Sequence, residues 1–93
     1  MDADDIRQLA SQGEGQQLEF KRSLAELNTA TRTVAAFANT DGGVLLFGVR
    51  DSGEIIGVEI GQTTRERIVN RITGATDPVV YPSVEYVTVE ERG

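Results

Sequence analysis

The alternation of apolar and polar positions over residues 31–57 predicts a helix, a buried strand and a hairpin turn in succession. Four apolar residues in its first part recur at helical spacing: Val34, Ala35, Phe37 and Ala38. That spacing predicts an amphipathic helix over about 29–39. The glycines at 42–43 end this helix, because glycine adopts the left-handed conformation at little steric cost. The almost continuously apolar run 44–50 then favours a central strand.

The remaining patterns predict shorter elements on both sides of this unit. In chain order they are a helix over 4–12 stopped by Gly13, a strand over 18–21, a strand over 55–60 after a Ser52-Gly53 turn, a helix from about Thr63 to a stop at Gly74, and a strand over 84–89. Asn28 or Thr29 is the expected N-cap of the main helix. Thr63 and Glu66 have the spacing of a capping box.

These elements predict an α+β fold, with a mixed β-sheet of about four strands and two to three helices packed against it. Ninety-three residues form one small domain, so we assign 1–93 to a single domain. The charged run 90–93 resembles a turn into a further strand. We therefore expect an excised or C-terminally truncated part of a larger protein, with an unpaired edge strand.

Composition excludes several kinds of chemistry. The chain contains neither cysteine nor histidine, which rules out disulfides, thiolate metal sites and histidine bases within it. No apolar run approaches the length of a membrane span and no signal peptide is recognisable, so we expect a cytoplasmic protein without a membrane partner. The net charge of −6 argues against a nucleic-acid contact over the whole surface, but a local basic patch stays open.

Acidic residues near two strand ends form one candidate site. Glu14 and Glu19 are five residues apart with Lys21 beside them, and Asp51 follows the buried strand. Three converging carboxylates would bind Mg²⁺ or Mn²⁺ and activate water against a phosphodiester, with Lys21 neutralising the developing charge. The alternative is structural: solvated glutamates, a Lys21–Glu19 pair, and an Asp51 that only begins the hairpin turn.

The loop 39–43 is a second candidate. Its backbone could bind an anion, and Asn39 could reach a phosphate or a base edge. However, the negative end of a helix dipole repels phosphate, and the loop lacks the Gly-Lys-Ser/Thr ending of a Walker A sequence. A helix cap is the alternative interpretation.

Arginines form a third candidate. Arg67 and Arg71 are four residues apart on the predicted third helix, and Arg22 and Arg32 add positive charge around the main helix. Arginines on one helix face can contact nucleic-acid phosphates without reading sequence. The alternative is an ordinary solvated face.

Four short motifs follow one another along the chain: LEFK at 18–21, AFANTDGG at 36–43, FGVRD at 47–51 and GEIIG at 53–57. Together they resemble the Schlafen AlbA-like domain, a DNA-binding family of prokaryotic transcriptional-regulator type, over residues 6–86. The resemblance implies nucleic-acid binding within regulators. For the vertebrate members that are metal-dependent ribonucleases, it implies a three-carboxylate site, which transfers to Glu14, Glu19 and Asp51.

Three functions follow, in order of preference. The first is a nucleic-acid-binding module of a transcriptional regulator, not an enzyme and without a required cofactor, whose contacts are Arg22, Arg32, Arg67, Arg71 and Asn39. The second is a Mg²⁺- or Mn²⁺-dependent ribonuclease with Glu14, Glu19 and Asp51 as metal ligands and Lys21 assisting. The third is a dimerisation or scaffolding module that forms a homodimer through the C-terminal edge strand.

Overall fold

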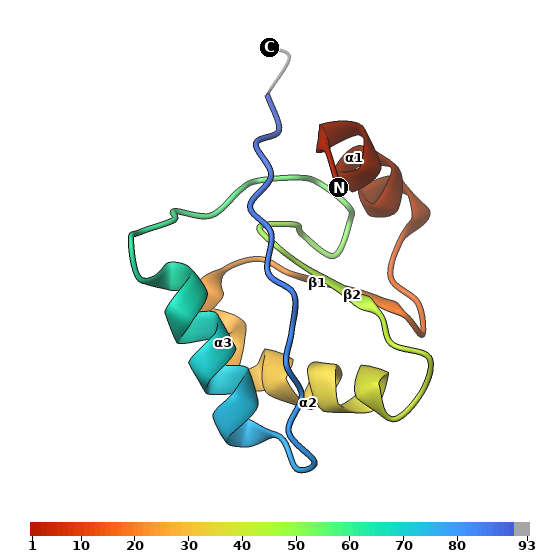
Figure 1. The fold of residues 1–93 in the computed structure, drawn as a ribbon. Coiled ribbons are helices and arrows are strands. Elements are labelled where there is room, and N and C mark those ends of the chain that lie inside the picture. Colours follow the sequence, from red (N-terminus) through yellow and green to blue (C-terminus); the bar gives the residue numbers. More distant parts are fainter. Residues whose placement is uncertain (91–93) are drawn as a thin grey trace.

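The computed structural model describes residues 1–90, which form a small α+β fold in three layers (Figure 1). A two-stranded sheet lies between one helix on one face and two helices on the other. In chain order the elements are α1 (Ala3–Gln12), β1 (Leu18–Lys21), the 3₁₀ helix η1 (Leu24–Glu26), α2 (Leu27–Ala38), β2 (Val44–Phe47) and α3 (Thr64–Ala75).

The sheet is a parallel pair joined by a helical crossover. Leu18 of β1 lies opposite Val44 of β2, and Lys21 lies opposite Phe47. Parallel neighbours need a long connection, and η1 with α2 supplies it. The prediction of about four strands is wrong for the described residues, because neither 55–60 nor 84–89 forms a strand. An isolated antiparallel bridge from Val49 to Ile55 is what remains of the predicted hairpin.

β2 ends at Phe47, earlier than predicted, because the chain turns sharply at Gly48. The carbonyl of Lys21 accepts hydrogen bonds from the N–H groups of both Gly48 and Val49, at 2.7 and 3.2 Å. Gly48 has a φ of +91° and packs so closely on Gly57 that an added Cβ would lie 2.8 Å from its carbonyl carbon. This turn folds residues 55–57 back onto the end of β2 and prevents a longer ladder.

α1 begins one residue before the predicted start, and its N-terminus is closed by two reciprocal hydrogen bonds. Asp2 and Asp5 form a reciprocal capping box, with side-chain to backbone hydrogen bonds of 2.9 and 3.0 Å. The hydrogen bond from the Asp5 N–H lowers the pKa of the Asp2 carboxyl. The predicted stop at Gly13 is confirmed, with a φ of +84°.

The predicted caps of α2 are wrong, since the helix starts before them. The Ser23 hydroxyl accepts a hydrogen bond from the Ala25 N–H and begins η1, which runs directly into α2. Asn28 and Thr29 therefore lie inside the first turn of α2, where their side chains cap nothing.

The predicted capping box of α3 is also absent. Thr63 makes no side-chain capping bond, and the neighbouring Thr64 hydroxyl accepts from the Gly61 N–H at 2.8 Å. The helix passes through Gly74 and ends at Ala75. There the buried Thr76 hydroxyl donates to the Ile72 carbonyl, which satisfies one of the last free acceptors of the helix.

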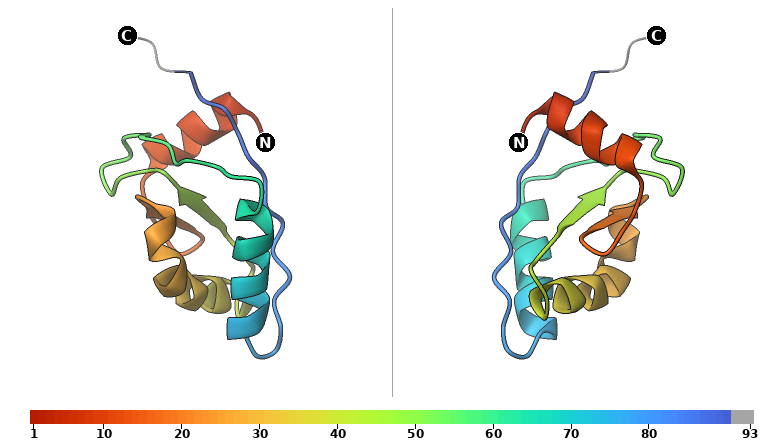
Figure 2. Two further views of the ribbon diagram at one scale, coloured as in Figure 1. Left: turned by 90° about the vertical axis from the view of Figure 1, so that its left-hand side faces the viewer. Right: turned by 90° about the vertical axis from the view of Figure 1, so that its right-hand side faces the viewer.

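α1 lies on one side of the sheet, and α2 and α3 lie on the other (Figure 2). Each side has its own apolar cluster. The first joins α1 to the strands and to Val49; its buried members are Ile6, Ala10, Leu18, Phe20, Leu46 and Val49. The second joins α2 to α3; its buried members are Leu27, Ile68 and Ile72. The alternation of apolar and charged residues in 18–21 predicts that Leu18 and Phe20 face the core, and both are buried. On α3, Ile68 and Ile72 are buried as well.

Residues 79–90 run as an extended segment from the end of α3 to α1 (Figure 1). Of the turn expected over 90–93, residues 91–93 lie outside the described residues. Among residues 1–90, no helix has the length and apolar character needed to cross a bilayer.

Candidate nucleic-acid interface

Arg67 and Arg71 lie one helical turn apart on the exposed side of α3. The helix presents Thr64, Ile68 and Ile72 to the interior, so the arginines project away from the second apolar cluster. No carboxylate of residues 1–90 lies within ion-pairing distance of either guanidinium. Both charges are therefore available to an external anion.

An open groove runs between these arginines and the start of α2. Its lining residues come from η1, α2 and α3: Leu24, Ala25, Leu27, Asn28, Thr63, Arg67, Asn70 and Arg71. Leu27 brings the two helices together by packing on Ile68 and Ile72. The groove contains two cations and no acidic side chain. Residues at the starts of α2 and α3 line the groove. The N-terminal end of each helix carries the positive end of the helix dipole.

Arg32 and Arg22 flank this groove in sequence. Arg32 follows Asn28 by one turn of α2 and is exposed, so it extends the same helix face. Arg22 is also exposed and lies just before η1, where its backbone N–H donates to the Glu26 carboxylate at 2.8 Å.

Asn39 is not part of the groove. It is the exposed C-cap of α2, and roughly 16 Å of helix separates it from Asn28 at 1.5 Å per residue. The N–H of Gly42 donates to the Phe37 carbonyl at 2.9 Å, so the loop 39–43 closes the helix. The structure thus places Asn39 at the opposite end of α2 from the arginine pair.

Asn70 and Thr63 were not among the predicted site residues. Asn70 follows Arg67 by three positions, so helical spacing alone places it on the same side of α3. Asn28 was predicted only as a helix cap, but in the structure it lines the groove.

Glu19 and Lys21 form a polar pair on the face of β1 that α2 covers. The Lys21 ammonium lies 3.3 Å from the Glu19 carboxylate, and the Thr33 hydroxyl of α2 donates a short 2.5 Å hydrogen bond to the same carboxylate oxygen. The Lys21 side chain is only 14% exposed, which strengthens the attraction relative to a surface pair. The alternation in 18–21 predicts that these two side chains lie on one face of the strand, and their contact confirms it.

Glu14 and Asp51 have other surroundings. The Glu14 carboxylate accepts a hydrogen bond from the Phe20 N–H at 3.0 Å. Asp51 is exposed in a turn closed by the Arg50 N–H, which donates to the Glu54 carbonyl at 2.9 Å. Within residues 1–90, no three acidic side chains lie together in a way that could hold a metal ion. The carboxylates as arranged do not fit a three-carboxylate Mg²⁺ or Mn²⁺ site, and the nuclease assignment stays a sequence-based prediction.

Comparison with known proteins places this arrangement in a family. The model of the Schlafen AlbA_2 domain matches residues 14–93. The chain belongs to the Schlafen AlbA_2 family. The resemblance noted in the motifs is thereby confirmed at the level of the family.

A curated relative is a protein of Ureaplasma parvum serovar 3 named as an uncharacterized ATP-binding protein. It is 45% identical over 49 residues, which cover 50% of this chain and 14% of the relative. No solved structure matches the chain significantly.

The matched Schlafen AlbA_2 residues begin after α1. They include both strands, α2, α3 and the groove between the two helices. α1 precedes the match, yet it supplies Ile6 and Ala10 to the first apolar cluster. One face of the sheet in this chain is therefore covered by a helix from outside the matched segment.

Proposed function

We propose that this Schlafen AlbA_2 domain is a nucleic-acid-binding module of a cytoplasmic transcriptional regulator, and that it contacts phosphates through the groove between α2 and α3. The observation that carries the proposal is the pair Arg67 and Arg71, which line that groove without a carboxylate partner in residues 1–90. Asn28 and Asn70 add amide donors beside them. Arg32 and Arg22 extend the positive surface.

The chemistry of the groove favours backbone contacts over base reading. It contains no aromatic side chain for stacking. Arginine and asparagine donors can hold phosphate oxygens whatever the sequence. A net charge of −6 restricts the attraction to this local surface. We therefore expect modest affinity, little sequence preference and strong dependence on salt.

Family membership supports a nucleic-acid-related role. ATP binding, named for the Ureaplasma relative, is not part of the proposal, since this chain contains no Walker A sequence. Homodimerisation through the C-terminal segment remains a separate prediction. Sedimentation across a range of concentrations tests it, and a monomer at every concentration would refute it.

Fluorescence anisotropy with labelled duplex DNA and RNA of equal length tests the proposed function. The double variant Arg67→Gln/Arg71→Gln is expected to bind about tenfold more weakly at about 50 mM salt, because two phosphate contacts are lost. Arg50→Gln is the matched control, since that arginine is paired with Glu54 outside the groove. Equal weakening by both variants would show only a general charge effect, and unchanged binding by the double variant would refute the proposal.

A further inference from the structure

Residues 79–90, called here the C-terminal strap, cross the molecule from the end of α3 to α1 (Figures 1 and 2). Half-buried Val80 and Val84 pack on the cluster between α2 and α3. Val87 and Val89 pack on the cluster beneath α1. One extended segment thus contacts both apolar clusters.

The strap is not held by a β-ladder. Within the described residues, the backbone N–H groups of 81–90 donate no hydrogen bond to protein. At the start of the strap, the backbone N–H of Val80 donates to the hydroxyl of Thr76, which precedes the strap, at 2.9 Å. Most of its length is therefore attached by side-chain contacts alone.

Three cations hold the strap at separate points. The Met1 ammonium lies 3.2 Å from the Glu85 carboxylate. The Arg65 guanidinium of α3 lies over the Tyr86 ring, 4.9 Å from its centroid. Arg7 of α1 donates to the carbonyl oxygen of Glu90 at 3.2 Å.

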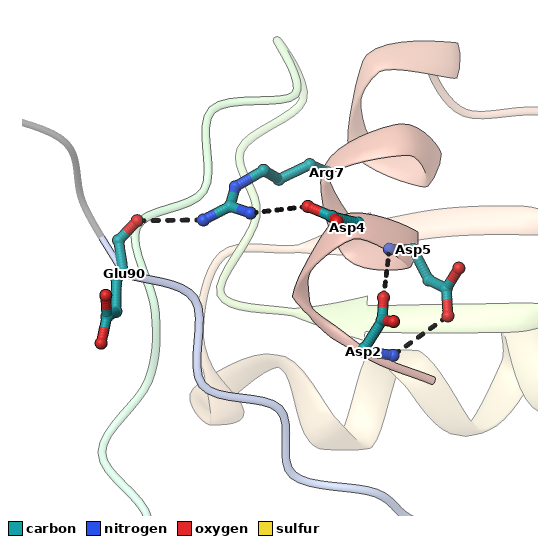
Figure 3. Close-up of polar contacts among 5 residues, drawn as sticks. All are labelled: Asp2, Asp4, Asp5, Arg7 and Glu90. Atoms are coloured by element: carbon teal, nitrogen blue, oxygen red, sulfur yellow. Dashed lines mark hydrogen bonds and ion pairs between the residues drawn. The ribbon is translucent and has the colours of Figure 1, made fainter.

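Figure 3 shows the last of these contacts. The Arg7 side chain bridges from Asp4 on its own helix, at 3.0 Å, to the Glu90 carbonyl on the strap. All three attachments are solvent-accessible; the side chains of Arg7 and Glu85 are 38% and 56% exposed. Exposed contacts of this kind are individually weak and are screened by salt.

The strap covers a large, mainly apolar hollow of about 1300 Å³. All four residues of β2 line it, and so do Val84, Val87 and Val89 of the strap. The buried residues of the two clusters come from the helices, the strands and Val49, and none from the strap. The strap therefore contributes only half-buried side chains to the two clusters.

We propose that the C-terminal strap is a detachable cover, which opens as a unit and exposes the apolar hollow along β2 while the rest of the domain stays folded. Segments with few buried contacts and no backbone pairing open at lower free energy than the core. The three cationic contacts set how often this happens. The strap is thus a salt-sensitive conformational switch that is separate from the groove between α2 and α3.

Limited proteolysis with chymotrypsin tests this switch, because the Tyr86–Val87 bond lies in the strap and the Phe47–Gly48 bond lies at the end of β2. Cleavage at Tyr86–Val87 reports how often the strap is open, and cleavage at Phe47–Gly48 reports how often the sheet is unfolded. Arg7→Gln and Arg65→Gln are each expected to raise cleavage at Tyr86–Val87 about two- to fivefold. Cleavage at Phe47–Gly48 and the far-UV spectrum should stay unchanged. Arg50→Gln, which disrupts an ion pair with Glu54, is the matched control.

The wild-type chain provides a second test that needs no substitution. Raising the salt from about 50 mM to about 1 M should increase the ratio of cleavage at Tyr86–Val87 to that at Phe47–Gly48, since screening weakens the attachments. Binding of the dye ANS should rise in parallel as the hollow is exposed. Parallel changes at both bonds would mean that the strap leaves only on global unfolding and would overturn the proposal. An unchanged ratio in salt and in both arginine variants would overturn it as well.

Discussion

The Glu14 carboxylate accepts a hydrogen bond from the backbone N–H of Phe20, at 3.0 Å across the loop that leads into β1. Phe20 is 2% exposed and lies in the middle of that strand. A buried strand donor without a partner is costly, so this contact fixes the entry of the chain into the sheet. Glu14 thus has a structural role that the sequence interpretation did not assign to it.

Removing that acceptor is expected to destabilise the fold. Glu14→Ala should lower the free energy of unfolding by about 0.5–1.5 kcal/mol, because the Phe20 N–H loses its partner. Glu14→Gln keeps an acceptor oxygen and should cost clearly less. Urea denaturation followed by circular dichroism measures both. Equal losses for the two variants would show that the charge of Glu14, and not its hydrogen bond, supports the fold.

The turn after β2 predicts a difference between two glycines with similar φ angles. Gly48 and Gly57 both have positive φ, but only Gly48 would bring a Cβ within 3 Å of the facing backbone. Gly48→Ala should therefore destabilise the domain by roughly 1–3 kcal/mol more than Gly57→Ala. Thermal melts of the two variants, compared with wild type, give this difference. Similar melting temperatures would contradict the close packing at this turn.

The stability of the domain should depend on pH through the amino terminus. The hydrogen bond to Glu85, with the charge of that carboxylate, raises the pKa of the Met1 α-amino group above its ordinary value of 8.0. The contribution is complete below pH 8, where both folded and unfolded chains are protonated, and is lost as pH rises through the raised folded pKa. Urea midpoints from about pH 7 to about pH 10 measure it. Glu85→Gln should flatten this part of the curve, and an identical curve would refute the pairing.

The arrangement of the acids also predicts the outcome of a nuclease assay. Because Glu14, Glu19 and Asp51 do not form a joint metal site in the described residues, tRNA incubated with the protein and Mn²⁺ should stay intact. Gel electrophoresis of the RNA is the readout. Cleavage that needs Mn²⁺ and disappears in Glu19→Gln would contradict this expectation and support the ribonuclease alternative.

Local sequence patterns predicted the helices and the first strand well. The alternation in 18–21 placed β1 at its observed bounds and brought Glu19 and Lys21 to one face. The start of α2 was missed because Ser23 initiates a 3₁₀ turn that runs into the helix. A cap preference cannot distinguish the first residue of a helix from residues within its first turn, where Asn28 and Thr29 lie.

The missing strands have a different explanation. The strand predicted over 84–89 is an extended segment without a ladder, in which Val84 packs on one cluster and Val87 and Val89 on the other. Alternation in the sequence cannot indicate whether a neighbouring backbone is available to pair with this segment. Helical spacing in the sequence was enough to place Arg67 and Arg71 on one side of α3. It could not place Asn28 beside them, because that position depends on how α2 packs on α3.

The salt dependence of nucleic-acid binding tests the proposed groove most directly. For duplex DNA, the slope of log Kobs against log salt changes by about 0.9 for each phosphate contact. Removing Arg67 and Arg71 together should therefore reduce the steepness of that slope by about 1.8, with equal effect on unrelated sequences. A slope identical to that of the wild type, measured on the folded double variant, would show that these arginines do not contact phosphates.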